Sequence, residues 1–145
     1  MLSRTFLWPQ GYTSAAMISV NLDAEFYGRI FYPGIDVSEG DIQRLGWTGM
    51  EYGLPHLLDC FREHGVKGTF FIPGRVAELY PDAVRAIADA GHELGCHGYE
   101  HEILAHFTPE EQLELLKKAK AAIEKAAGRA VTGFRMPEGE ILSLI

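Results

Sequence analysis

Short apolar runs rich in β-branched and aromatic residues alternate along this chain with longer stretches in which apolar residues recur every three or four positions. The first pattern is typical of buried strands, and the second is typical of amphipathic helices. Strands that alternate with helices usually pair in parallel, because a parallel pair needs a crossover connection. The sequence therefore predicts an α/β fold built on a parallel sheet.

Four strands are expected, one in each of the ranges Ala15–Leu22, Lys67–Ile72, His92–Cys96 and Val131–Phe134. Helices are expected between them, over Tyr52–His64 with Gly65 as the residue after its end, and over Pro81–Gly91. The stretch from Tyr27 to Gly53 has several glycines and no sustained period. We expect it to be a long surface excursion.

The clearest helix signal lies near the C-terminus. Thr108 and Glu111 form a capping box around Pro109, which is favoured at the first helical position. This helix is expected to end at Gly128 and to bury the apolar residues Leu113, Leu116, Ala119, Ile123 and Ala126.

Length and charge limit the possible partners. A chain of 145 residues with 47% hydrophobic residues suits one domain with a real core. The excess of 20 Asp and Glu over 13 Lys and Arg gives a net charge of −7, which disfavours binding to nucleic acid.

Location is inferred from what the sequence lacks. The N-terminal apolar run ends at Pro9, well short of a signal-peptide core, and no stretch approaches the length of a transmembrane helix. Two cysteines, Cys60 and Cys96, are too few for a disulfide scaffold. We therefore expect a cytoplasmic protein that does not bind membranes.

Polar residues follow three of the expected strands, at residues 21–25, 96–101 and 135–139. Ligands of parallel sheets bind at the carboxyl ends of the strands. His97 and His101 are four residues apart, so on a helical turn both imidazoles would face one divalent metal. Asp23, just after the first strand, is the carboxylate that would complete the ligand set.

Four segments in chain order resemble the signatures of the polysaccharide deacetylase family, also called the NodB homology domain: SVNLDAE, GVKGTFFIPG, AGHELGCHGYEHE and GFRMPEGE. The resemblance implies a distorted (β/α) barrel, here an incomplete barrel of about four βα units. It also implies a metal-dependent hydrolase that removes acetyl groups from N-acetylated sugars. The HGYEH form is most similar to the subgroup of peptidoglycan-deacetylase-like and metal-independent allantoinase-like proteins.

The resemblance also implies roles for individual residues. Asp23, His97 and His101 match the ligands of a divalent metal, most simply zinc, and Arg135 matches the arginine that contacts the catalytic carboxylate. By the same resemblance Pro137 would help to shape a substrate groove, and Tyr99 and Glu138 are further candidates for that groove.

Two departures from the family pattern matter. Asn21 stands where the family has its general base, and an amide cannot accept that proton at neutral pH. Glu25 is a candidate substitute. The family's later motifs, one of which carries a general-acid histidine, are absent from residues 1–145, so we expect a partial domain.

Three functions stay open at this point. The first is metal-dependent deacetylation of an N-acetylated saccharide or related small amide, impaired by Asn21. The second is a metal-independent, allantoinase-like cyclic amidase, and the third is an inactive module for glycan binding or assembly. An open sheet edge and the apolar residues after Gly139 predict a homo-oligomer, or completion by a separate C-terminal half.

Overall fold

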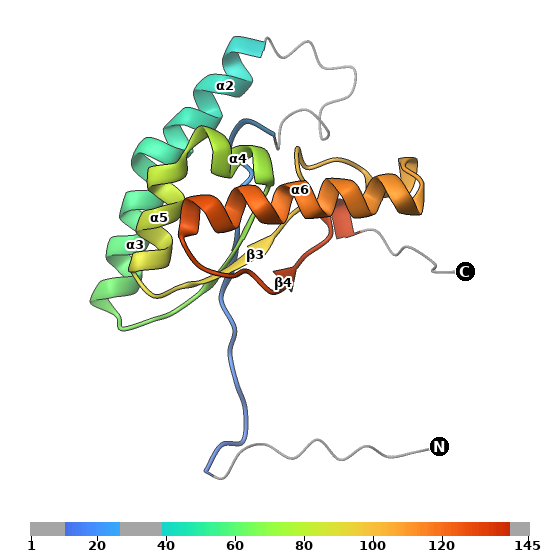
Figure 1. The fold of residues 1–145 in the computed structure, drawn as a ribbon. Coiled ribbons are helices and arrows are strands. Elements are labelled where there is room, and N and C mark those ends of the chain that lie inside the picture. Colours follow the sequence, from blue (N-terminus) through green and yellow to red (C-terminus); the bar gives the residue numbers. More distant parts are fainter. Residues whose placement is uncertain (1–10, 27–38, 140–145) are drawn as a thin grey trace.

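The computed structural model describes residues 11–26 and 39–139, and its centre is a sheet of four parallel strands (Figure 1). The strands are β1 (Ser19–Asn21), β2 (Thr69–Ile72), β3 (Glu93–Cys96) and β4 (Gly133–Phe134), and they are neighbours in chain order. The predicted α/β class is confirmed. A sequential, open parallel sheet also fits an incomplete barrel of about four βα units.

The strands are shorter than predicted, but their register explains the position of the polar residues. Asn21 pairs with Phe71, and Cys96 pairs with both Ile72 and Phe134. The carboxyl ends of all four strands therefore lie along one edge of the sheet. The loops that follow β1, β3 and β4 start there.

Three predicted helices are present, as α3 (Leu54–Glu63), α5 (Pro81–Asp89) and α6 (Pro109–Ala127). The capping box at Thr108 is formed, and Gly128 ends α6 with a φ of 68°. One prediction for α6 is wrong, since Leu113 is 53% exposed. The first turns of α6 extend beyond α4 in Figure 1, so α4 does not cover this part of the helix.

The predicted surface excursion is wrong for residues 39–53. These residues form α2 (Glu39–Thr48) and a π-helical turn, η2 (Gly49–Gly53), that leads directly into α3. Residues 27–38 lie outside the described part of the chain. Helix α2 meets the 3₁₀ turn η1 (Ala24–Phe26) through Gly46, where a Cβ would lie 2.4 Å from the backbone nitrogen of Glu25. Because α2 makes this contact through a glycine, its sequence shows no apolar stripe from which the helix could be predicted.

A second helix that the sequence did not reveal is α4 (Gly74–Leu79), which begins immediately after β2. It packs against α6 so closely that a Cβ on Gly74 would lie 2.5 Å from the Cα atom of Ala119. Two further 3₁₀ turns follow β3 and β4, namely η3 (Leu104–His106) and η4 (Pro137–Gly139).

The core lies around the sheet, where helices α4, α5 and α6 pack and where Leu54 and Phe61 of α3 join the same buried cluster. Its fully buried side chains include Phe70, Ile72, Val84, Ile87 and Ile123. His92 is also buried, and its Nδ1 accepts a hydrogen bond from the Gly68 amide at 3.1 Å. Burial lowers the pKa of His92, so its ring stays neutral, and the hydrogen bond to Gly68 gives it a structural role.

The two cysteines are not joined, because Cys60 is exposed and Cys96 is buried. Burial raises the pKa of the Cys96 thiol to about 11, which keeps it protonated and unreactive. Among the helices in the described ranges, none is both long and apolar enough to cross a membrane.

Candidate metal centre

Two loops, one after β1 and one after β3, bring the predicted ligands together at the carboxyl edge of the sheet. Asp23 lies two residues after β1, and its carbonyl oxygen accepts a bond from the Phe26 amide that closes the η1 turn. His97 directly follows β3, and its amide donates to the Ile72 carbonyl oxygen at 3.0 Å. The sheet itself therefore fixes the position of His97.

The four-residue spacing predicts that His97 and His101 lie on one helical turn, and this local geometry is wrong. The residues between them form a loop in which Gly98 has a φ of 72° and His101 a φ of 59°. Two left-handed residues reverse the chain and return His101 toward His97, so that their ring centroids are 4.9 Å apart. The convergence of the imidazoles was correctly predicted, but its cause was not.

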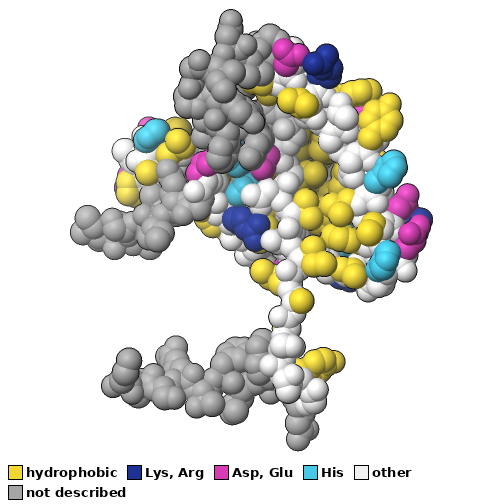
Figure 2. Space-filling model, turned by 180° about the vertical axis from the view of Figure 1, so that it is seen from behind, with side chains coloured by type: hydrophobic (Ala, Val, Ile, Leu, Met, Phe, Trp, Pro, Cys, Tyr) yellow, Lys and Arg dark blue, Asp and Glu magenta, His cyan; other side chains and the backbone are white. Residues whose placement is uncertain are grey.

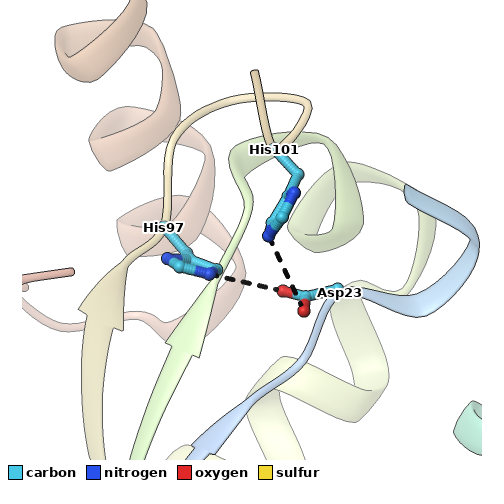
Figure 3. A group of neighbouring side chains, drawn as sticks. All are labelled: Asp23, His97 and His101. Atoms are coloured by element: carbon cyan, nitrogen blue, oxygen red, sulfur yellow. Dashed lines mark ion pairs between the residues drawn. The ribbon is translucent and has the colours of Figure 1, made fainter. Parts of the chain in front are cut away.

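Both imidazoles face the Asp23 carboxylate (Figure 3). The Nε2 atom of His97 lies 3.7 Å from Oδ1, and the Nε2 atom of His101 lies 3.8 Å from Oδ2. One ligand atom from each residue can be chosen so that all three lie within 4.8 Å of one another. All three residues are buried.

The unsatisfied atoms of this cluster indicate what it would hold. Asp23 Oδ1 and His97 Nε2 are both buried and have no hydrogen-bond partner in the described part of the chain. Leaving such atoms unpaired costs free energy, and a cation between them would satisfy both. Two imidazoles and one carboxylate are a donor set that suits zinc and related divalent metals. The residues therefore fit a divalent metal.

The protonation states also favour metal binding near neutral pH. Burial, and then the nearby charge of Glu138, raise the pKa of Asp23 to about 6. Burial lowers the pKa of both His97 and His101. A metal needs an ionised carboxylate and neutral imidazoles, and both conditions are met above about pH 6.5, the ordinary pKa of histidine.

Arg135, in the loop after β4, reaches across the sheet to β1. Its Nη1 donates to Asn21 Oδ1 and its Nη2 donates to Ser19 Oγ, both at 2.8 Å. Its guanidinium carbon lies 4.1 Å from the centre of the Phe71 ring. The arginine is thus held by a hydrogen-bonded fork and by a cation–π contact.

The Phe71 ring lies against a glycine of the next strand. A Cβ on Gly95 would come within 2.6 Å of two atoms of this ring. Gly95 therefore leaves the space in which Phe71 supports Arg135.

A hollow of about 260 Å³ opens beside Asp23, between β1 and helices α2 and α3. Asn21 and Asp23 contribute polar atoms to it, and its apolar lining includes Val20, Leu45, Met50, Leu54 and Leu57. Figure 2 shows hydrophobic side chains gathered on this side of the molecule. The candidate site therefore borders a mostly apolar surface.

Comparison with known proteins decides the family. The profile that describes polysaccharide deacetylases matches residues 46–145, which is well over half of the chain. The chain belongs to the polysaccharide deacetylase family. The match contains His97, His101 and Arg135, while Asp23 precedes it.

Relatives within the polysaccharide deacetylase family include two bacterial peptidoglycan deacetylases. A peptidoglycan deacetylase of Helicobacter pylori is 36% identical over 113 residues, which cover 78% of this chain and 38% of the relative. A peptidoglycan-N-acetylglucosamine deacetylase of Bacillus cereus is 40% identical over 88 residues, which cover 61% of this chain and 32% of the relative. The chain thus spans about a third of the length of these two proteins.

Solved structures of polysaccharide deacetylases support the same assignment. A putative polysaccharide deacetylase from Mycobacterium smegmatis aligns with a TM-score of 0.81 and 32% identity, covering 95% of this chain and 48% of that one. A CE4 family pseudoenzyme from Bacillus anthracis aligns with a TM-score of 0.62 and 34% identity, covering 66% of this chain and 34% of that one. A mutant of that pseudoenzyme is described as having restored enzymatic activity.

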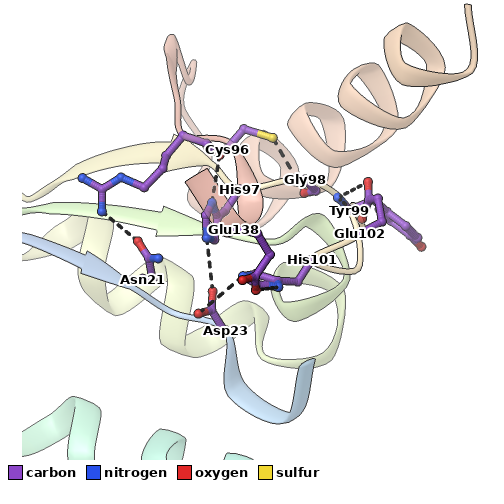
Figure 4. A network of polar contacts seen from close by, with 10 residues as sticks. Asn21, Asp23, Cys96, His97, Gly98, Tyr99, His101, Glu102 and Glu138 are labelled. Atoms are coloured by element: carbon purple, nitrogen blue, oxygen red, sulfur yellow. Dashed lines mark hydrogen bonds and ion pairs between the residues drawn. The ribbon is translucent and has the colours of Figure 1, made fainter. Parts of the chain in front are cut away.

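Two of the residues expected to line a substrate groove are packed into the protein instead. Tyr99 is buried, its hydroxyl donates to Glu78 at 3.0 Å, and Lys118 lies over its ring at 3.7 Å. Figure 4 shows Tyr99 directed away from Asp23. Pro137 is buried as well, and its Cγ would lie 3.0 Å from a Cβ on Gly98.

The third expected groove residue, Glu138, lies at the candidate metal site. Its Oε1 is 3.6 Å from Nδ1 of His101 (Figure 4). Glu25, the suggested substitute base, accepts a hydrogen bond from the Tyr80 hydroxyl at 3.3 Å. Glu138, and not Glu25, is therefore the second carboxylate beside the predicted ligands. The sequence predicts Glu138 only as a residue of the substrate groove.

Proposed function

We propose that this chain carries the metal site of a hydrolase that removes the acetyl group from an N-acetylated glycan. The observation that carries the proposal is the buried set of Asp23, His97 and His101, whose ligand atoms lie within 4.8 Å of one another. The similarity to the peptidoglycan deacetylases of Helicobacter pylori and Bacillus cereus supports a cell-wall glycan as the substrate class. Zinc is the metal that we propose.

The chain's own residues supply binding and orientation. A divalent metal held by the three ligands would lower the pKa of a water and polarise the acetyl carbonyl group. Arg135 lies beside this position and brings a positive charge to the carboxyl end of β1. The apolar hollow next to Asp23 offers a surface for the uncharged parts of a glycan.

The experiment measures acetate release from N-acetylated chitooligosaccharides and from peptidoglycan, with zinc and after treatment with a chelator. We expect zinc-dependent release that is lost in His97→Ala and kept in His56→Ala, a substitution at an exposed residue of α3. Because Asn21 lacks a proton-accepting carboxylate, we expect a rate below ~1 s⁻¹, the lower end of ordinary enzyme rates. Failure to bind zinc would contradict the proposal, and metal-free turnover of allantoin would favour the cyclic amidase.

An inactive binding or assembly module is the second candidate, and one observation favours it. Asn21 Oδ1 accepts a hydrogen bond from Arg135, so an amide is firmly held where the family has its general base. The pseudoenzyme from Bacillus anthracis is a precedent within the family. Zinc binding without acetate release by the wild type, combined with release by Asn21→Asp, would support this candidate over an active enzyme.

We also propose that the open edges of the sheet pair with another polypeptide. Within the described residues, β1 pairs with β2 alone and β4 with β3 alone. Phe134, on the outer strand β4, is 43% exposed. An unpaired strand edge is a template for association, and either a second copy or a separate C-terminal half of the family domain would satisfy it.

A further inference from the structure

The two histidines of the metal cluster are held differently at their second ring nitrogen. Nδ1 of His97 lies 2.8 Å from the carbonyl oxygen of Arg135. A carbonyl oxygen can only accept, so Nδ1 of His97 carries the proton and its Nε2 presents a lone pair to Asp23. The loop after β4 thereby selects the ring form of His97 that can bind a metal.

Nδ1 of His101 has no hydrogen-bond partner in the described residues, and neither has Oε1 of Glu138. These two buried atoms are 3.6 Å apart, which is longer than a hydrogen bond. The side chain of His101 is 3% exposed and that of Glu138 is 18% exposed, so water has little access to either. A small rotation of the Glu138 side chain would satisfy both atoms at once.

The backbone supports this pairing. His101 and Glu138 both have a φ of 59°, a left-handed conformation that costs a residue with a side chain about 1–2 kcal/mol. Glycine would adopt it without that cost, yet position 138 carries a glutamate. Strained residues of this kind concentrate at functional sites. The left-handed turn brings the Glu138 carboxylate to His101.

We propose that Glu138 is a positioning residue whose carboxylate accepts the Nδ1 proton of His101, so that Nε2 of His101 is free to bind the metal. Arg135 and Glu138 would then act alike, each orienting one histidine from the loop after β4. The importance of this role for catalysis rests on the proposed function. The ring form of His101 itself can be measured without any metal.

The test records the ring forms of both histidines by ¹H–¹⁵N NMR on ¹⁵N-histidine-labelled, metal-free protein at about pH 8. We expect His101 to be protonated at Nδ1 in the wild type and in Glu138→Gln, which keeps an acceptor oxygen. In Glu138→Gly, protonation should shift toward Nε2. Because glycine relieves the left-handed backbone, this variant should fold, and His97 serves as the internal control since its partner is a backbone oxygen.

A second measurement is zinc affinity, obtained by competition with a chromophoric chelator. Loss of a partner of this kind typically weakens metal binding 10–100-fold, so we expect that loss in Glu138→Gly and a smaller loss in Glu138→Gln. An unchanged His101 ring form in Glu138→Gly would overturn the inference even if zinc binds. A wild type with the expected ring forms but no zinc binding would overturn the proposed function instead.

Discussion

Nδ1 of His97 donates a hydrogen bond to the carbonyl oxygen of Arg135, across the neighbouring strands β3 and β4. The same arginine directs its guanidinium toward Asn21 on β1. One residue thus connects a proposed metal ligand with the position of the family's general base. Substitutions in the loop after β4 should therefore affect both.

We expect the purified protein to bind about one divalent ion, and His97→Ala and His101→Ala to abolish binding. Each substitution removes one of three ligands from a buried site, and water would not replace the lost lone pair in the same position. Metal content after zinc loading and desalting is the measurement, with His56→Ala as the matched control. Equally low metal content in the wild type and the variants would contradict the prediction.

The free energy of unfolding should depend on pH through Asp23. Its pKa is raised from 3.8 to about 6 in the folded protein, so between these values the unfolded chain ionises while the folded protein keeps its proton. Stability contributed by this group is therefore lost as pH rises from about 4 to about 6. A shift of about two units corresponds to about 3 kcal/mol.

Asp23→Asn isolates this contribution. In the presence of a chelator, we expect the variant to be about 3 kcal/mol more stable than the wild type at pH 7 and nearly equal to it at pH 3.5. Urea denaturation at several pH values measures the difference in the free energy of unfolding between the variant and the wild type. The buried histidines have the opposite pH dependence, but they are present in both proteins, so their contribution to this difference largely cancels. Saturating zinc should reverse the order at pH 7, since only the wild type keeps the ligand. A constant difference across this range would show that Asp23 is not the titrating group.

Gly98→Ala should destabilise the fold more than Gly65→Ala. Both glycines have a left-handed φ, 72° and 64°, so both substitutions cost about 1–2 kcal/mol of backbone strain. A Cβ at Gly65 would meet no atom within 4 Å, whereas at Gly98 it would lie 3.0 Å from Pro137. Chemical denaturation should show the excess loss, and only Gly98→Ala should weaken zinc binding. Equal losses of stability in the two variants would mean that the loop around Gly98 rearranges to accommodate the Cβ atom, and would contradict the prediction.

The chain should associate at micromolar concentration because of the open edge of β4. Phe134→Lys places a charge on this exposed strand, which is a common protection against edge pairing, and we expect it to shift the protein toward monomer. Leu113→Lys, on the exposed side of α6, is the control. Sedimentation equilibrium distinguishes the outcomes. A wild type that stays monomeric would remove the basis for the proposed pairing.

Local signals made much of the fold predictable. The capping box at Thr108 and the left-handed Gly128 depend on near neighbours in the chain, so the limits of α6 could be read from the sequence. Helix α2 could not, because it contacts the rest of the protein through Gly46 instead of an apolar stripe. Helix α4 is only six residues long and begins at Gly74, two residues after the predicted strand Lys67–Ile72 ends, so it is too short to show a helical period.

Only part of the candidate site could be predicted from the sequence. Asp23, His97 and His101 follow strands, and parallel strands bring such residues to one edge. The position of Glu138 depends instead on a left-handed φ at a residue with a side chain, which no local pattern indicates. The burial of Tyr99 depends on contacts with α4 and α6, which are distant in sequence.

The position of Arg135 in the candidate site depends on Gly95, a residue with no polar side chain. Its missing side chain leaves room for the Phe71 ring, and that ring supports the guanidinium of Arg135. Even Gly95→Ala would push the ring and, through it, the arginine, although Gly95 has no functional group. A random-mutagenesis screen for lost activity should therefore recover Gly95 together with Arg135. Engineers who redesign this site should keep β3 unchanged at this residue.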